Sequence, residues 1–166
     1  MLNNRLNRKP RGASGAKATD PNAAMDSLVR LLSARERSVQ EAHKRLAEKG
    51  FDSKASSEAV NRALDCGLLD DQRFAKRLIE VKIAAGWGEY RINQELYRFG
   101  IPKDSIEGYP EAFFAAEDQL ERALQALKKH RSRAKNPRQA AFKYLISRGF
   151  DSEIAGAAVK ARHSEL

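Results

Sequence analysis

The chain has 166 residues, 42% of them hydrophobic and 7% aromatic, and its formal net charge is +9. This length supports one domain or a short series of repeats, and the surplus of positive charge favours a polyanionic partner, either nucleic acid or an acidic protein face. A soluble protein that is merely basic is the alternative. A single cysteine, Cys66, excludes an intrachain disulfide and is expected to be a small buried hydrophobe. No apolar run approaches the ~20 residues of a membrane-spanning helix, so we expect a cytoplasmic protein.

Residues 1–20 are expected to form a disordered basic tail. The first 19 residues contain five Arg or Lys and neither Asp nor Glu, with Gly, Ser, Asn and Pro between the charges. Such a segment buries too little apolar surface to fold alone, although its charges can contact phosphates or an acidic surface. A transit peptide is the alternative interpretation of this Arg-rich composition.

The first predicted repeat, residues 21–66, contains three helices. Asp20 before a proline is typical of a helix start, and apolar residues at helical spacing follow. Ser38 begins the second helix with a capping box completed by Glu41, and a left-handed glycine ends that helix. Asp52 is expected to cap the third helix.

The second predicted repeat, residues 67–109, follows the same plan. Asp70 or Asp71 caps its first helix, which ends at the Gly-Trp-Gly sequence of residues 86–88. Its second helix ends at a glycine, and a short third helix runs through Ile106. The third predicted repeat, residues 110–166, begins with a long helix that includes Phe113 and Phe114. Asn136 and the proline after it start the next helix.

A short sequence pattern occurs once in each predicted repeat. A leucine is followed four residues later by a glycine and then by Phe or Ile, and the glycines are Gly50, Gly100 and Gly149. They are 50 and 49 residues apart, and self-similarity at a fixed period predicts copies of one structural unit. We therefore predict an all-α protein of three tandem three-helix repeats, which form an elongated, curved array of right or left hand. Each glycine is expected to end the second helix of its repeat.

Catalytic motifs are scarce in this sequence. His43, His130 and His163 lie far apart, none is paired with a cysteine or a second histidine, and no Gly-rich phosphate loop or nucleophile elbow occurs. The doublet of Asp70 and Asp71 could hold Mg²⁺, but capping of a helix start accounts for it better. We expect neither enzymatic activity nor a cofactor nor a metal.

Basic residues carry the main functional signal. Nine Lys or Arg and no acidic residue occur from Arg122 to Arg148. A surface that only has to be solvated could carry charges of both signs, so this one-sided charge favours contact with a polyanion or an acidic protein. In the second predicted repeat, Arg91 and Arg98 share one helix face, and further cations line the preceding helix. Aromatic residues between these cations are too few for a base-stacking platform. The candidate binding residues are Arg73, Lys76, Arg77, Arg91, Arg98, Lys128, Lys129, Arg131, Arg133, Arg138 and Lys143.

Residues 67–75, Gly-Leu-Leu-Asp-Asp-Gln-Arg-Phe-Ala, resemble the signature of the RecX family, regulatory proteins that bind the RecA recombinase. Residues 31–38, 46–51, 86–88 and 96–101 are similar to the family pattern in order and spacing. The resemblance covers roughly residues 24–166 and is loosest in the third predicted repeat. Within the signature, we interpret Leu68, Leu69 and Phe74 as packing residues at the junction between repeats.

The resemblance implies a modulator of RecA. RecX-like proteins consist of three tandem three-helix repeats and lodge in the groove of the RecA–single-stranded DNA filament. There they oppose filament growth and suppress ATPase, strand exchange and coprotease activity, functions that belong to DNA repair, homologous recombination and the SOS response. The resemblance also implies a monomer without a cofactor, and weak direct DNA binding. The rival hypotheses are a stand-alone basic nucleic-acid-binding protein and a helical scaffold for an unrelated protein.

Overall fold

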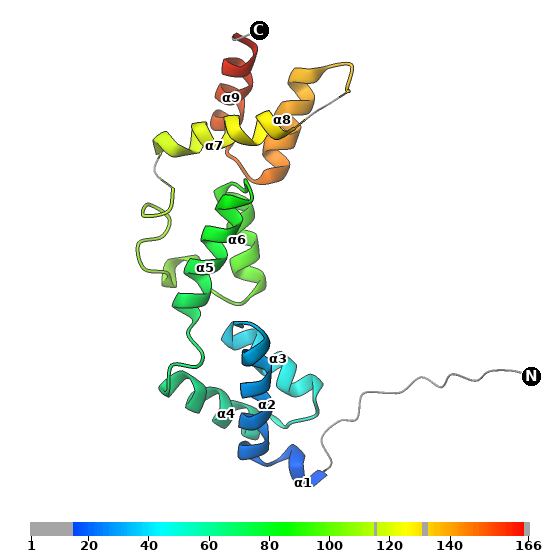
Figure 1. The fold of residues 1–166 in the computed structure, drawn as a ribbon, viewed down its shortest axis with the longest axis vertical. Helices are drawn as coiled ribbons and strands as arrows, with labels where there is room; N and C mark the ends of the chain where they lie inside the picture. The colour runs from blue at the N-terminus through cyan, green and yellow to red at the C-terminus, as the bar shows by residue number, and fades with distance from the viewer. Residues whose placement is uncertain (1–14, 115, 131–132, 165–166) are drawn as a thin grey trace, which may run out of the picture. The chain divides into compact units, whose positions relative to one another are not determined.

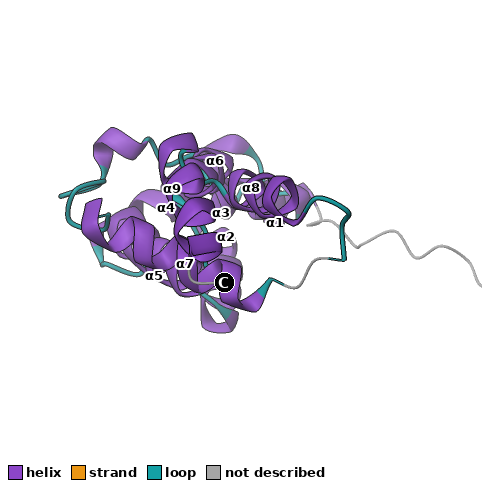
Figure 2. Ribbon diagram, turned by 90° about the horizontal axis from the view of Figure 1, so that it is seen from above, coloured by secondary structure: helices purple, strands orange, loops and turns teal. Residues whose placement is uncertain are grey.

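The computed structural model describes residues 15–114, 116–130 and 133–164, and this part of the chain is helical with no strand (Figures 1 and 2). The helices are α1 (Gly15–Ala18), α2 (Pro21–Ala34), α3 (Val39–Glu48), α4 (Ser53–Asp65), α5 (Asp71–Ala84), α6 (Glu89–Arg98), the 3-10 helix η1 (Lys103–Ser105), α7 (Ala116–Lys129), α8 (Pro137–Arg148) and α9 (Ser152–Ser164). Most of the predicted tail, residues 1–14, lies outside the described residues. Its last part differs from expectation, because α1 forms one helical turn there.

The chain divides into two compact units, residues 1–71 and residues 72–166, which we call the N-terminal and C-terminal units. In the N-terminal unit, α2, α3 and α4 surround a core that includes the fully buried Leu28 and Leu46. The predicted caps are present, since Ser38 Oγ accepts from Glu41 N at 3.2 Å and Asp52 Oδ1 accepts from Ala55 N at 2.7 Å. These side chains satisfy backbone N–H groups that have no partner inside the helix.

Two expectations for the N-terminal unit are corrected. The Glu41 carboxylate, which a capping box would place on the Ser38 N–H, forms ion pairs with Arg35 and Arg37. Cys66 is exposed, because it follows α4 as its C-cap and lies outside the buried stripe of that helix.

In the C-terminal unit, α5 and α6 pack around Ile79, Ile92 and Leu96. The third helix expected through Ile106 is only the 3-10 turn η1, and the following segment turns at Gly108, whose φ is +73°. Phe113 and Phe114 precede α7 instead of lying within it. Phe114 is 6% exposed and belongs to the core of α5 and α6.

The helices α7, α8 and α9 share a core that includes Leu127 and Leu145. Asn136 caps α8 as predicted, accepting from Gln139 N at 3.1 Å. The end of α8 packs against the start of α6, because Gly88 N donates to Arg148 O at 2.8 Å and Tyr90 N donates to Gly149 O at 3.1 Å. These carbonyls accept hydrogen bonds at the start of α6, where the N-cap is a glycine and offers no side-chain acceptor.

The repeated glycines have one geometry. Gly50, Gly100 and Gly149 follow α3, α6 and α8 with φ values of +89°, +73° and +87°. In each case the next residue donates its N–H to the carbonyl of the leucine that begins the repeated pattern, at 3.0–3.1 Å. This is the hydrogen-bond arrangement of a Schellman helix end, which requires a left-handed residue and so favours glycine.

Candidate functional site

The RecX-like signature, residues 67–75, contributes to two cores, but Leu68 and Asp71 differ from the expectation. Leu69 is 2% exposed in the core of the N-terminal unit, and Phe74 is buried in the core of α5 and α6. Leu68 is 44% exposed, so the prediction that it packs is wrong. Asp71 is the first residue of α5, and its carboxylate accepts a hydrogen bond from Val39 N, at the start of α3, at 2.9 Å.

Arg91 is held by contacts within the C-terminal unit. Its guanidinium carbon lies 4.0 Å from the centre of the Trp87 ring, and Nη1 donates to Ser147 O of α8 at 3.0 Å. The Lys82 ammonium lies 4.1 Å from the same ring centre. Arg91 therefore joins α6 to α8 and supports the fold, a role that its position on a helix face did not indicate.

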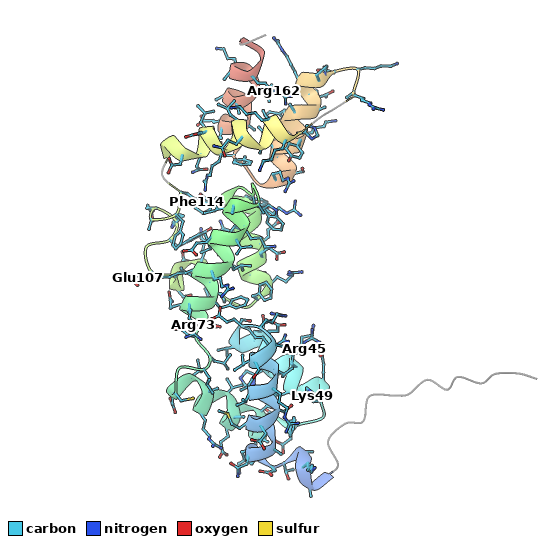
Figure 3. The ribbon with its side chains drawn as sticks, viewed as in Figure 1. Arg45, Lys49, Arg73, Glu107, Phe114 and Arg162 are labelled. Atoms are coloured by element: carbon cyan, nitrogen blue, oxygen red, sulfur yellow. The ribbon has the colours of Figure 1, made fainter. Side chains whose placement is uncertain are left out.

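The other candidate cations of α5 and α6 are more exposed. Arg98 is 67% exposed and pairs with Glu95 of its own helix at 2.7 Å. Lys76 pairs with Glu107 at 3.3 Å, and Arg73 and Arg77 lie on the exposed part of α5 (Figure 3 labels Arg73 and Glu107). Exposed ion pairs of this kind contribute little to stability, so these side chains can exchange partners at small cost.

The remaining candidates belong to α7, α8 and the segment between them. Lys128 and Lys129 form the last turn of α7, and both are exposed. The other described members of the group are also exposed: Arg133, Arg138 and Lys143. Arg131 lies outside the described residues.

A pocket of about 180 Å³ brings one of these candidates together with two cations that were not among them. Arg122 from α7, Lys129 from the end of α7 and Arg148 from α8 line it, next to the C-terminal end of α5. Other lining residues are Ile83, Ala84, Ala85, Gly86, Gln125, Ala126 and Tyr144. Arg122 and Arg148 both lie in the acid-free stretch of sequence, and this is the only sequence signal that points to them. Their positions along the helices do not predict that they meet.

Arg122 is the least satisfied cation of this pocket. Its Nε and Nη2 atoms are buried and have no hydrogen-bond partner among the described residues. Its guanidinium carbon lies 4.9 Å from the centre of the Phe114 ring. Burial lowers the pKa of the Arg122 guanidinium from its ordinary value, and the nearby Asp118 carboxylate opposes this shift.

Aromatic contacts define the wall of the pocket at Tyr144. The Tyr144 ring stacks on His130, with centroids 4.0 Å apart and an interplanar angle of 11°. The Arg148 guanidinium lies 5.2 Å from the Tyr144 ring centre, and its Nη1 donates to Ala85 O at 3.4 Å. Arg148 thus meets both the aromatic wall and the end of α5.

The described residues show neither a metal centre nor a membrane-spanning helix. No group of three or more His, Cys, Asp or Glu side chains there could hold a metal ion. Likewise, no helix in that part of the chain is long and apolar enough to cross a membrane.

These features define a protein of the all-α class, whose described residues form successive helical cores with many exposed cations. The family model for the first three-helix domain of RecX matches residues 24–62, and the model for the second matches residues 70–108. Regulatory protein RecX of Legionella pneumophila (strain Corby) is 32% identical over 135 residues, which are 79% of this chain and 89% of the relative. The chain belongs to the RecX family.

Further relatives and solved structures agree with this assignment. Regulatory protein RecX of Caldanaerobacter subterraneus is 30% identical over 130 residues, covering 78% of this chain and 66% of the relative. A crystal structure of regulatory protein RecX has 25% identity and a TM-score of 0.73, with 93% of this chain and 79% of that chain covered. RecX from Lactobacillus salivarius, at 20% identity, shares the fold with a TM-score of 0.72 over 86% of this chain and 96% of that chain.

Proposed function

We propose that this protein is an inhibitory, non-enzymatic regulator that binds the RecA–single-stranded DNA filament in its groove. It modulates RecA ATPase, strand exchange and coprotease activity in recombination, DNA repair and the SOS response, and it acts in the cytoplasm as a monomer. The observation that carries the proposal is the match of two successive RecX three-helix domains to residues 24–62 and 70–108. The acid-free basic window between Arg122 and Arg148 supports a polyanionic target.

The architecture proposed for this function has three repeats, residues 21–66, 67–109 and 110–166. The helix end at Gly149 supports the third repeat, because it reproduces the helix ends at Gly50 and Gly100. The position of Phe114 in the core of α5 and α6 moves the start of that repeat a few residues toward α7. An array of preformed helices spares most of the ordering cost of binding, and contacts to neighbouring protomers would resist the rearrangement that accompanies ATP turnover.

The proposed contacts to RecA or DNA come from the exposed cations of α5 to α8. Arg91 leaves this group, because its guanidinium is already engaged by Trp87 and Ser147. The described residues that remain are Arg73, Lys76, Arg77, Arg98, Lys128, Lys129, Arg133, Arg138 and Lys143.

The test compares three measurements on the full chain: affinity for bare single-stranded DNA, affinity for RecA-coated DNA, and the rate of RecA ATP hydrolysis. The proposal expects tighter binding to the coated DNA and slower ATP hydrolysis, at both low and high salt. Equal affinities and an unchanged hydrolysis rate would instead support the stand-alone nucleic-acid-binding protein. Its affinity would fall steeply with salt, by about 0.7 log unit per log unit of salt for each phosphate contacted on single strands. No binding to either target would favour the scaffold.

Charge reversal then locates the contact. Arg98→Glu alters α6 and Lys128→Glu alters α7, and both side chains are exposed enough to be changed without disturbing a core. If neither variant weakens inhibition of strand exchange, the assignment of the contact to these cations is wrong.

A further inference from the structure

We propose that the pocket lined by Arg122, Lys129 and Arg148 binds a backbone phosphate of single-stranded nucleic acid. This inference rests on the proposed function and deepens it, because it identifies one place where the DNA of the filament would be held. The pocket lies wholly within the C-terminal unit, between α7, the end of α8 and the residues that follow α5.

The first reason is the state of Arg122. The large majority of buried side-chain polar atoms in native proteins have a hydrogen-bond partner, and a buried charged donor without one is costly. Two of the Arg122 nitrogens, Nε and Nη2, have no such partner among the described residues. The Phe114 ring stabilises the charge through its face but accepts no conventional hydrogen bond from these N–H groups. The nearby Asp118 carboxylate supplies some countercharge but accepts no hydrogen bond from Nε or Nη2, so a bound anion would supply the missing acceptor oxygens.

The second reason is the charge of the pocket wall. Three of its ten lining residues are cations and none is acidic, and Gln125 adds a neutral side chain that can donate. The volume of about 180 Å³ is below the ~300–1,000 Å³ of typical small-molecule sites, so it suits one anionic group and not a whole nucleotide.

The third reason distinguishes a polymer phosphate from a protein carboxylate. The exposed cations Lys128, Arg133, Arg138 and Lys143 come from the same acid-free stretch of sequence as the pocket residues. One carboxylate would use only the pocket, whereas a nucleic-acid backbone carries regularly spaced charges that further cations can neutralise. Arg also matches phosphate oxygens with two parallel N–H donors.

A purely structural role would also account for most of these cations. The C-terminal end of α5 carries partial negative charge, which favours nearby cations, and Arg148 already donates to Ala85 O there. This explanation leaves the buried Nε and Nη2 atoms of Arg122 unpartnered, and it predicts no effect of these residues on DNA affinity.

The test uses the full chain and two matched pairs of variants. Arg122→Gln is compared with Arg30→Gln on α2, and Lys129→Gln is compared with Lys54→Gln on α4. Arg30 and Lys54 are exposed cations of the N-terminal unit, and neither is among the proposed binding residues. Each pair removes the same formal charge, so a difference within a pair reports position and not net charge.

Affinity for a fluorescein-labelled oligothymidylate is measured by fluorescence anisotropy over a range of salt concentrations. We expect Arg122→Gln to weaken binding about tenfold or more. We also expect it to reduce the slope of log affinity against log salt by about 0.7. Lys129→Gln should reduce the slope by a similar amount, and both controls should match the unmodified chain. Circular dichroism and the Tm establish folding, and the exposed Lys129 carries the test if Arg122→Gln does not fold.

Four outcomes would overturn the inference or separate it from the proposed function. Equal DNA affinity in a folded Arg122→Gln, a folded Lys129→Gln and their controls would show that the cations are structural. Binding of polyglutamate that is lost in Arg122→Gln, while the same variant binds DNA with unaltered affinity, would assign the pocket to a carboxylate. RecA ATP hydrolysis is measured in parallel. If the pocket variants bind DNA with unaltered affinity and the protein still inhibits RecA, only the phosphate site is rejected. If Arg122→Gln loses DNA affinity but the unmodified chain has no effect on RecA, only the proposed function is rejected.

Discussion

The Asp71 carboxylate accepts a hydrogen bond from the Val39 N–H at 2.9 Å, across 32 residues of sequence. Val39 is the first residue of α3, and its N–H has no acceptor within that helix. An aspartate at the start of one helix therefore caps the start of another. Ser38, which is fully buried, caps the same end through Glu41 N, so two side chains share the first turn of α3.

Replacing Asp71 tests this long-range cap. Asp71→Ala should lower the free energy of unfolding by about 1 kcal/mol, because the Val39 N–H loses its acceptor. Asp71→Asn should retain most of the stability, since its side-chain oxygen can accept the same hydrogen bond. Urea unfolding of the two variants and the unmodified chain measures the difference, and equal losses in both variants would contradict a capping role for the oxygen.

The ionisation of Asp71 predicts a dependence on pH. Burial raises the pKa of the Asp71 carboxyl above its ordinary value of 3.8, the Val39 N–H opposes this shift, and Asp70 adds to it. A raised folded-state pKa means that the fold is less stable with the ionised carboxylate than with the protonated carboxyl group. Protonation removes this cost as the pH falls through the raised pKa toward 3.8. The stability of Asp71→Asn relative to the unmodified chain should therefore be greater at pH 7 than near pH 3.5, as measured by urea unfolding at each pH.

The contact between α8 and α6 predicts unequal costs for two glycine substitutions. Gly67 and Gly149 both have positive φ, but a Cβ on Gly67 would meet nothing within 4 Å, whereas one on Gly149 would lie 2.4 Å from Arg91 N. Gly67→Ala should cost only the left-handed penalty of about 1 kcal/mol. Gly149→Ala should cost about 1–3 kcal/mol more, because the backbone of α6 must move. Thermal and urea unfolding compare them, and similar losses would argue against a tight contact.

Arg91 and Arg98 share a face of α6 but should respond differently to substitution. Arg91→Gln removes the contact with Trp87 and the hydrogen bond to Ser147 O, so it should lower the free energy of unfolding by about 1–2 kcal/mol. Arg98→Gln breaks a pair with Glu95 and a contact with the Phe99 ring 5.1 Å away, both made by a largely exposed side chain, and should change stability by less than about 1 kcal/mol. If Arg98 contacts the filament, its variant should weaken filament binding without a change in Tm.

Local sequence signals predicted the helix ends well. Ser38, Asp52 and Asn136 cap helices where the sequence placed them, and Gly50, Gly100 and Gly149 end helices in the left-handed conformation. Each of these outcomes depends on a few neighbouring residues, because a cap or a helix end is made by backbone groups within one turn.

Burial was predicted less well where it depended on distant segments. Leu68 and Cys66 are exposed although their residue types favour burial, and Phe114 lies in the core of α5 and α6 although its neighbours suggested a helix of the following repeat. Which apolar side chain fills a gap depends on the shape of the surrounding core, and spacing along the chain does not contain that shape.

The sequence by itself determined the helical class, most helix boundaries, the repeated helix ends and the excess of positive charge, since each depends on residue type and short spacing. Only the tertiary structure decided which side chains from different helices contact one another. It engaged Arg91 with Trp87 and α8, it placed Arg122 beside Lys129 and Arg148, and it turned Asp71 toward Val39. These pairings join residues from different helices, and their positions follow from how the helices pack.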